Sequence, residues 1–260
     1  MSTKITTELI KELRDATGIA IMQCKRALEE ADGDMKKALA ILKKTSSDIA
    51  QKKAGREAKD GRVSIKEGKD KSILLALHCE TDFVAKNEDF ANLLSSLGDK
   101  ALKEGIEKMK TEAKEMIDGV IQKTGEKIEL GEIYEVKGET LGNYVHHNNK
   151  IGVIVSLEGG NKELAKDVAM HVAAMKPEYI SSDEVSEDVK KTMSEIFQKE
   201  IADVDKPKEI KEKMLAGKMA TYFKEKTLMD QLFFKDGDKT IGKLLDEAKV
   251  KIKEVKRYSI

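Results

Sequence analysis

The run Ile73-Leu74-Leu75-Ala76-Leu77, followed by Glu80-Thr81-Asp82-Phe83-Val84-Ala85-Lys86-Asn87, decides the fold of this chain. The apolar run predicts a β-strand that is buried on both faces, because no polar side chain alternates with its residues. An acid, a hydroxyl, a second acid and a large aromatic then follow, and a helix is expected to begin near Asn87. The sequence therefore predicts a strand-to-helix corner that carries Phe83.

Phe83 has two interpretations at this corner. The chain has 6 Phe, 5 Tyr and no Trp, so an aromatic in such a position is unusual. Its side chain could fold back beneath the following helix as part of the core. Alternatively, it is an exposed wedge, held beside the carboxylate of Asp82 to enter a partner protein. The periodicity of the sequence does not choose between the two.

The charge balance limits the classes of partner. The 260 residues include 48 basic and 48 acidic side chains, so the formal net charge is zero. No global field is available to attract nucleic acid or an anionic membrane, and neither is expected as a partner. Charged residues make up 37% of the chain, above the usual value of about 25%, which indicates much solvent-exposed helix surface.

The cysteines and the N-terminal segment predict a soluble cytoplasmic protein. Cys24 and Cys79 lie far apart and neither belongs to a CxxC or metal-ligand spacing, so both are expected to be reduced thiols. Residues 1–20 contain neither an apolar signal region nor an Arg-rich amphipathic presequence. The apolar runs are much shorter than a membrane span.

Residues 1–45 predict a three-helix N-terminal module, and residues 46–60 predict a polar linker that is partly helical. The helices of the module are expected to turn apolar stripes inward at three- and four-residue spacing. The inward residues are Leu9, Ile10, Leu13, Ile21, Cys24, Leu28, Ala31, Met35, Ala38, Leu39 and Leu42. This small apolar mass is typical of a binding module.

From residue 61 the pattern predicts two α+β subdomains, each a small antiparallel sheet with helices on one face. The first covers residues 61–140, and the second covers residues 141–182 and 227–260. A strand at 150–157, with the helix after it, repeats the strand, corner and helix of the first subdomain. The predicted fold class is therefore α+β.

Residues 183–226 interrupt the second subdomain. Narrow apolar stripes follow two charged helices, and Asp205-Lys206-Pro207 turns the chain between them. Pro207 suits the first position of the second helix. The segment is expected to be an antiparallel helical hairpin that projects from the body of the protein.

The residues that most often carry chemistry are poorly placed for it. His78 and Cys79 are neighbours on a strand, so their side chains diverge and cannot pair as base and nucleophile. His146-His147-Asn148-Asn149 lacks a third metal ligand and predicts a turn or a partner-contacting surface. His171, in mid-helix, predicts an ordinary half-buried histidine.

The chain also lacks GxxxxGK[ST] and GxGxxG phosphate loops. No cofactor, metal or small-molecule substrate is expected. The sequence therefore predicts a modular binding protein rather than an enzyme.

The order of short motifs resembles the bacterial elongation factor Ts family over nearly the whole chain. The similar segments are Glu12-Leu13-Arg14, Thr17-Gly18, Cys24-Lys25-Arg26-Ala27-Leu28, Thr81-Asp82-Phe83-Val84, Tyr144-Val145-His146, Ile151-Gly152-Val153, residues 170–178, 207–217 and 240–245. Two features differ from the family pattern. Gln231-Leu232 stands where the family has Gln-Pro, and the sequence ends at Ile260 without a Gly-Glu-Gly tail, so no contact from such a tail is expected.

The resemblance implies a UBA-like N-terminal module and a guanine-nucleotide exchange factor for elongation factor Tu. It implies that Thr81, Asp82, Phe83 and Val84 form the contact that disturbs the partner's Mg²⁺ site, with Phe83 as a wedge between partner helices. It further implies partner contacts by Lys25, from the N-terminal module, and by His146 at a second interface. The alternative is a non-catalytic adaptor that joins partners through its three-helix head and its helical hairpin.

Overall fold

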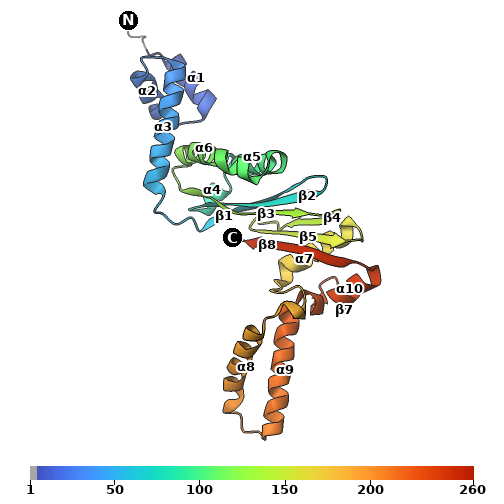
Figure 1. The fold of residues 1–260 in the computed structure, drawn as a ribbon. Helices are drawn as coiled ribbons and strands as arrows, with labels where there is room; N and C mark the ends of the chain where they lie inside the picture. The colour runs from blue at the N-terminus through green and yellow to red at the C-terminus, as the bar shows by residue number, and fades with distance from the viewer. Residues whose placement is uncertain (1–4) are drawn as a thin grey trace.

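The structure is a computed structural model that describes residues 5–260. The first four residues of the expected N-terminal module lie outside this range. A helical head lies at one end of the molecule, two β-sheets with their helices form the middle, and a long helical hairpin extends from the other end (Figure 1). The fold is α+β, as the sequence predicts.

The head consists of three helices with well-defined ends. They are α1 (Thr7–Thr17), α2 (Ile21–Glu30) and α3 (Met35–Lys53). Thr6 caps α1, and Asp34 caps α3 by accepting hydrogen bonds from two backbone N–H groups of the first turn. Gly18 ends α1 in the left-handed conformation. The sequence prediction of three helices is therefore correct.

Two side chains of the head differ from their expected orientation. The sequence predicts that Ile21 and Leu39 point inward, but they are 51% and 42% exposed. The head is so small that Leu13, Cys24 and Leu28 already fill its interior, and each of them is fully buried. Periodicity predicts the helices correctly, but it predicts apolar faces that are wider than the buried faces in the structure.

Helix α3 continues through half of the expected linker, residues 46–60. Ser46 is buried, and Ile49 and Ala50 pack against the core beneath helix α6 (Ile106–Thr124). Polar residues therefore form helix here because a neighbouring helix covers their inner face. The head is attached to the body through α3 rather than by a free linker.

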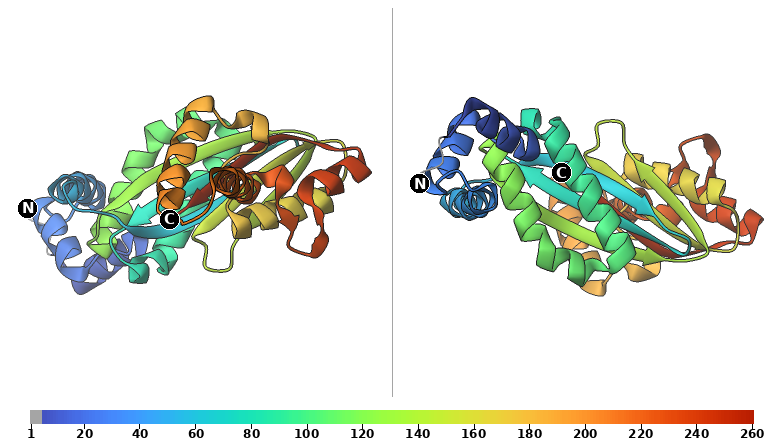
Figure 2. Two further views of the ribbon diagram at one scale, coloured as in Figure 1. Left: turned by 90° about the horizontal axis from the view of Figure 1, so that it is seen from below. Right: turned by 90° about the horizontal axis from the view of Figure 1, so that it is seen from above.

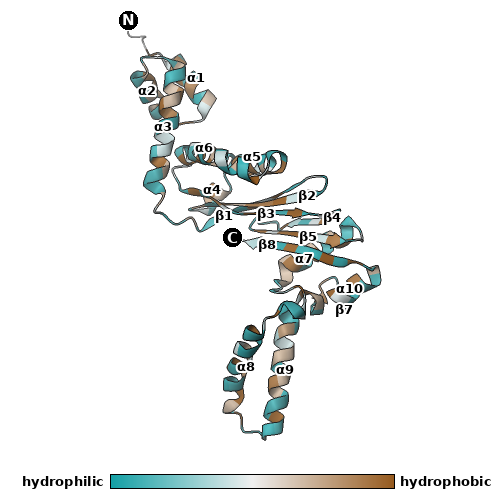
Figure 3. Cartoon of the chain, viewed as in Figure 1, coloured by the Kyte–Doolittle hydropathy of each residue, from teal (hydrophilic) through white to brown (hydrophobic). Residues whose placement is uncertain are grey.

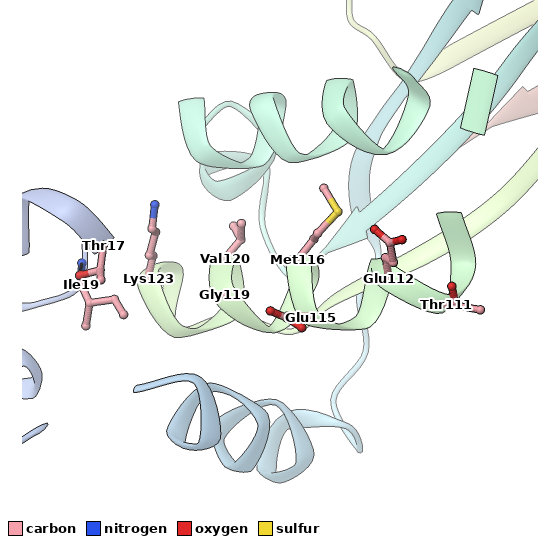
Figure 4. Close-up of a pocket in the computed structure, with 9 residues that line it drawn as sticks. All are labelled: Thr17, Ile19, Thr111, Glu112, Glu115, Met116, Gly119, Val120 and Lys123. Atoms are coloured by element: carbon pink, nitrogen blue, oxygen red, sulfur yellow. Dashed lines mark hydrogen bonds between the residues drawn. The ribbon is translucent and has the colours of Figure 1, made fainter. Parts of the chain in front are cut away.

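A cleft separates the rest of the head from α6 (Figure 4). It has a volume of about 620 Å³, and its lining combines Thr17 and Ile19 of the head with residues of α6 such as Glu112 and Lys123. The head and α6 are also joined directly, because the side-chain amide of Gln122 donates a hydrogen bond to Gln23 Oε1 at 3.0 Å. The head thus contacts α6 with polar groups as well as through α3.

The first sheet has the strand order β1-β2-β3 and is antiparallel. Its strands are β1 (Asp60–Glu67), β2 (Lys71–Cys79) and β3 (Ile128–Lys137). Helices α5 (Glu88–Glu104) and α6 lie across one face of it, as the view from above shows (Figure 2). Ile73, Leu75 and Leu77 point from β2 into this helix-covered core.

The second sheet has the order β4-β5-β8 and is also antiparallel. Its strands are β4 (Thr140–Val145), β5 (Ile151–Glu158) and β8 (Lys251–Ser259). Helices α7 (Lys162–Met175) and α10 (Ile241–Ala248) pack on one face, where Val153 and Val155 are fully buried. Both predicted subdomains therefore contain the expected kind of sheet.

The two sheets pack against each other through their remaining faces. Leu74 of β2, Val136 of β3 and Ile154 of β5 form one buried cluster between them. His78 and Tyr258 join the sheets by a hydrogen bond of 2.9 Å. The layers run helix, sheet, sheet, helix, which explains why β2 is buried on both faces although it is antiparallel.

The hairpin consists of α8 (Glu187–Ala202) and α9 (Lys208–Lys226), as predicted. Pro207 is the N-cap of α9 rather than its first helical residue. Phe197 and Tyr222 pack edge to face between the helices. Hydrophilic and hydrophobic residues are mixed along both helices (Figure 3). None of the helices within residues 5–260 combines the length and the apolar character needed to cross a membrane.

Short elements complete the chain around the base of the hairpin. They are the 3-10 helices η1 (Ser182–Glu184) and η2 (Leu228–Asp230) and the two-stranded pair β6 (Leu232–Phe233) and β7 (Asp236–Thr240). The buried Gln231 connects this region to α7, because its side chain hydrogen-bonds to His171 Nε2 at 2.9 Å. His171 is thus fully buried rather than half-buried, and burial lowers its pKa.

Candidate functional site

The corner after β2 is a single helical turn between the strand and α5. This turn, α4, spans Asp82–Ala85. Thr81 is its N-cap, with an extended backbone and a side-chain oxygen that accepts a hydrogen bond from Val84 N at 3.4 Å. Asn87 then caps α5 in the same way. The break that the sequence predicts is therefore a pair of consecutive helix starts.

Phe83 is exposed at this corner, so the interpretation of Phe83 as a core residue is wrong. Its exposed fraction is 81%, the highest among the exposed large hydrophobic side chains in residues 5–260. Val84 and Ala85 occupy the inner face of the turn and are buried. The space beneath the helices is filled by Phe90, which is fully buried. A large aromatic held in solvent by a folded turn is a typical anchor for a protein interface.

Asp82 lies beside Phe83 and is paired within the turn. Its carboxylate accepts a hydrogen bond from Lys86 Nζ at 2.7 Å, one helical turn away. Both side chains are largely exposed, so this ion pair contributes little to stability. The Asp82 carboxylate is therefore free to exchange Lys86 for a group of a partner protein.

Cys79 and His78 are unsuited to nucleophilic catalysis. Burial raises the pKa of the Cys79 thiol to about 12, which keeps it protonated at neutral pH. The thiol donates a hydrogen bond to the carbonyl of Thr81 at 3.2 Å, whereas His78 points to the other face and contacts Tyr258. Both cysteines of the chain are free and buried.

The structure brings His146 to the same edge of the molecule as the corner. His146 follows β4 in the turn that leads to β5, and its Nδ1 lies 2.9 Å from the hydroxyl of Tyr144. The next turn residues contact β1, because Lys150 Nζ lies 2.9 Å from Asp60 Oδ2. Asp60 in turn pairs with Cys79, next to the corner. The corner of the first subdomain and the His146 turn of the second therefore lie at the same edge of the molecule.

Lys25 lies on the exposed surface of α2 in the head. It forms an ion pair with Glu29 at 3.7 Å, and both side chains are about half exposed. Met22, one turn earlier on the same face of the helix, is 59% exposed. Met22 is absent from the residues predicted from the sequence, although its position beside the buried stripe of α2 is a usable signal.

The head lies close to the corner because α6 contacts both. Lys123, near the end of α6, lines the cleft against the head and pairs with Asp89 in the first turn of α5 at 2.7 Å. Lys53 of α3 donates a hydrogen bond to the carbonyl of Gly125, which ends α6. The head, the corner and the His146 turn thus follow one side of the molecule (Figure 1).

No group of three or more His, Cys, Asp or Glu side chains within residues 5–260 is arranged to hold a metal ion. His146 and His147 have their rings 4.2 Å apart, but no third ligand of these types accompanies them there. The edge is therefore a surface of one exposed aromatic side chain, apolar groups and scattered charges. Exposed aromatic and apolar side chains are typical of surfaces that contact another protein.

Comparison with known proteins identifies the family. The family model described as elongation factor TS matches residues 80–260, and a model of a UBA-like domain matches residues 6–42. The chain belongs to the elongation factor Ts family. It is 38% identical to elongation factor Ts of Hahella chejuensis, with 98% of this chain and 92% of that protein aligned. It is 39% identical to elongation factor Ts of Cellvibrio japonicus, over 98% of this chain and 90% of that one.

Membership of the elongation factor Ts family makes the chain a translation elongation factor. The UBA-like match covers α1, α2 and the first part of α3, so it agrees with the three-helix head. The family match begins at Glu80 and includes the whole corner. The segment with the most exposed aromatic thus lies at the start of the region that defines the family.

Proposed function

We propose that this chain is a guanine-nucleotide exchange factor that binds the GDP form of elongation factor Tu and promotes GDP release until GTP binds. The observation that carries the proposal is the 81% exposure of Phe83 on a folded turn in a chain of this family. In this proposal the chain acts in the cytoplasm and makes or breaks no covalent bond. Its partner is a protein, and no nucleic acid, membrane or small-molecule substrate is involved.

The proposed mechanism follows from thermodynamic linkage. A factor that binds the nucleotide-free GTPase more tightly than the GDP form must weaken GDP binding by the same factor. A hundredfold weakening requires about 2.8 kcal/mol of differential binding. Burial of one Phe side chain contributes about 1.5–3 kcal/mol, so Phe83 alone is of the required size. The exposed state of Phe83 in the free protein leaves this free energy available for binding.

Each candidate residue has a role in this mechanism. Phe83 inserts between partner helices near the Mg²⁺ site, and Asp82 disturbs the interactions that hold the ion. Loss of Mg²⁺ removes the cation that neutralises the nucleotide phosphates, which weakens GDP further. Thr81 and Val84 shape the turn between them. Lys25 of the head contacts the nucleotide domain, and His146 contacts a second region of the partner.

The proposal is tested by the release of a fluorescent GDP analogue from elongation factor Tu at fixed Mg²⁺. We expect the chain to accelerate release by at least about a hundredfold, in line with the binding free energy of one buried Phe. A stable complex without acceleration would instead support the adaptor, which binds regardless of GDP and Mg²⁺. Affinity measured with and without GDP provides the second readout.

Removal of residues 1–33, which include α1 and α2, is expected to weaken binding to elongation factor Tu by about tenfold or more, because the exposed surface around Lys25 and Met22 is lost. The remainder should melt at nearly the same temperature, since α3 keeps its contact with α6. The comparison is removal of residues 1–50, which also deletes Ile49 and Ala50 from the main core and should lower the melting temperature. Calorimetry gives both quantities, and an unchanged affinity would exclude the head from the interface.

A further inference from the structure

The turn that presents Phe83 is too short to hold its own shape. Helix α4 has 4 residues, and an isolated turn of this length is unstable in water because helix nucleation is unfavourable. Phe83 itself makes no compensating contact with the core, since its side chain is exposed. Burial of Val84 and Ala85 holds the inner face of the turn, and hydrogen bonds from groups outside the turn hold the residue at which it begins.

Glu126 supplies two such hydrogen bonds to one residue. Its Oε2 accepts from the backbone N–H of Thr81 at 3.0 Å, and its Oε1 accepts from the Thr81 hydroxyl at 2.7 Å. Two bonds from a single carboxylate fix both the position and the orientation of the residue they hold. Glu126 can reach Thr81 because Gly125 turns the chain at the end of α6 in the left-handed conformation.

Thr81, which Glu126 holds in place, is in turn hydrogen-bonded to residues of α4. Its hydroxyl accepts a hydrogen bond from Val84 N at 3.4 Å, and its carbonyl accepts one from Ala85 N at 3.1 Å. The Cys79 thiol also donates to the Thr81 carbonyl. Thr81 thus accepts the first two hydrogen bonds of α4, and a shift of Thr81 would tilt the turn and move Phe83.

A second carboxylate holds the preceding residue. Glu80 Oε1 accepts from the backbone N–H of Lys127 at 2.6 Å, and both oxygens lie 3.2 Å from Arg56 Nη1. The hydrogen bond from Lys127, above all, holds the pKa of Glu80 below its ordinary value, so this carboxylate stays charged at neutral pH. Consecutive residues 80 and 81 are thereby tied to consecutive residues 127 and 126.

We infer that Glu126 is a positioning residue, whose carboxylate fixes Thr81 and so pre-organises the turn that presents Phe83 to the partner. This inference rests on the proposed exchange function. Pre-organisation matters because a mobile wedge would lose conformational freedom on binding, and that loss would oppose the complex. The contact is formed by residues 45 positions apart in the sequence.

The test compares Glu126→Ala with Glu126→Gln and with the control Glu132→Ala, which removes an exposed carboxylate from β3. Loss of a bidentate, charge-assisted contact is expected to reduce the acceleration of GDP release by about tenfold for Glu126→Ala. Glu126→Gln keeps one acceptor and should lose less, and Glu132→Ala should equal the wild type. The melting temperature should change little, because Glu126 is only partly buried.

A double-mutant cycle that combines Glu126→Ala with Phe83→Ala tests whether Glu126 affects exchange by positioning Phe83 or in another way. If Glu126 acts through Phe83, Glu126→Ala should cause no further loss of exchange when Phe83 is already absent. An equal loss in both backgrounds would overturn the inference, and so would wild-type exchange by Glu126→Ala. In either of these cases the proposed exchange function would stand.

Amide hydrogen exchange of the free protein provides a readout that does not involve the partner. In Glu126→Ala, the backbone amides of Thr81, Val84 and Ala85 should exchange faster, while those of Leu75 and Leu77 on β2 should be unchanged. If the wild-type protein does not accelerate GDP release from elongation factor Tu, the proposed function is wrong. Amide hydrogen exchange then decides by itself whether Glu126 orders the turn. Unchanged protection at Thr81 and Val84 would overturn the inference in every case.

Discussion

Phe83→Ala is expected to reduce the acceleration of GDP release by about 10- to 100-fold, which corresponds to the loss of about 1.5–3 kcal/mol of apolar burial. The fold should be unaffected, because the side chain is 81% exposed and surface substitutions usually change stability by about 0.5 kcal/mol or less. Release of the GDP analogue and thermal unfolding of the same preparations measure the two effects.

Two further variants serve as comparisons for Phe83→Ala. Phe83→Leu retains apolar bulk at the same position and should show an intermediate rate of GDP release. Phe90→Ala removes a fully buried Phe and should lower the free energy of unfolding by about 3–5 kcal/mol. A Phe83→Ala protein that is folded and exchanges at the wild-type rate would refute the wedge. A large drop in its melting temperature would mean that Phe83 supports the fold after all.

Gly142→Ala is expected to be the most damaging single-methyl change in the second sheet. A Cβ at this position would lie 2.1 Å from the backbone carbon and oxygen of Ala165, so β4 could no longer pack on α7. Ordinary overpacking costs about 1–3 kcal/mol, and a clash with the backbone of α7, which cannot move aside as a side chain can, should exceed it. A loss of about 3 kcal/mol corresponds to a fall in melting temperature of about 6–12 °C for a chain of this size.

Gly119→Ala is the matched control for this substitution. Gly119 lies within α6, and a Cβ there would meet nothing within 4 Å. Replacement of a helical Gly by Ala usually stabilises by about 0.5–1 kcal/mol, so this variant should melt at the same or a higher temperature. Circular dichroism gives both values. Equal melting temperatures for Gly142→Ala and the wild type would show that β4 and α7 separate without cost.

The regular elements were largely predictable because their periodicity is local. The apolar run of β2, the start of α5 near Asn87 and the three helices of the head all appear where the sequence predicts them. Local patterns are less informative about what surrounds a residue. Residues 46–53, the helical part of the expected linker, are polar and are covered by α6, and Ile21 is apolar yet exposed because the head has no further interior to fill. Local patterns do not show which other segments will pack against a residue in the folded chain.

The candidate site was likewise predictable from the sequence only in part. The motif Thr81-Asp82-Phe83-Val84 and the family resemblance are readable from the sequence, and the comparisons bear out the family. The roles of these residues, of Lys25 and of His146 remain predictions. No local pattern indicates that Glu126 holds Thr81 or that the His146 turn meets β1, since each contact joins segments that are distant in the sequence.

By itself, the sequence determined the α+β class, the order of the parts and the family, because these depend on residue spacing and on motifs within short segments. Only the tertiary structure decided that the two sheets stack, and that Phe83 faces solvent while Phe90 fills the core. The physical reason is competition for space. A side chain is buried only where other segments supply a surface to cover it, and those segments come together only in the folded chain.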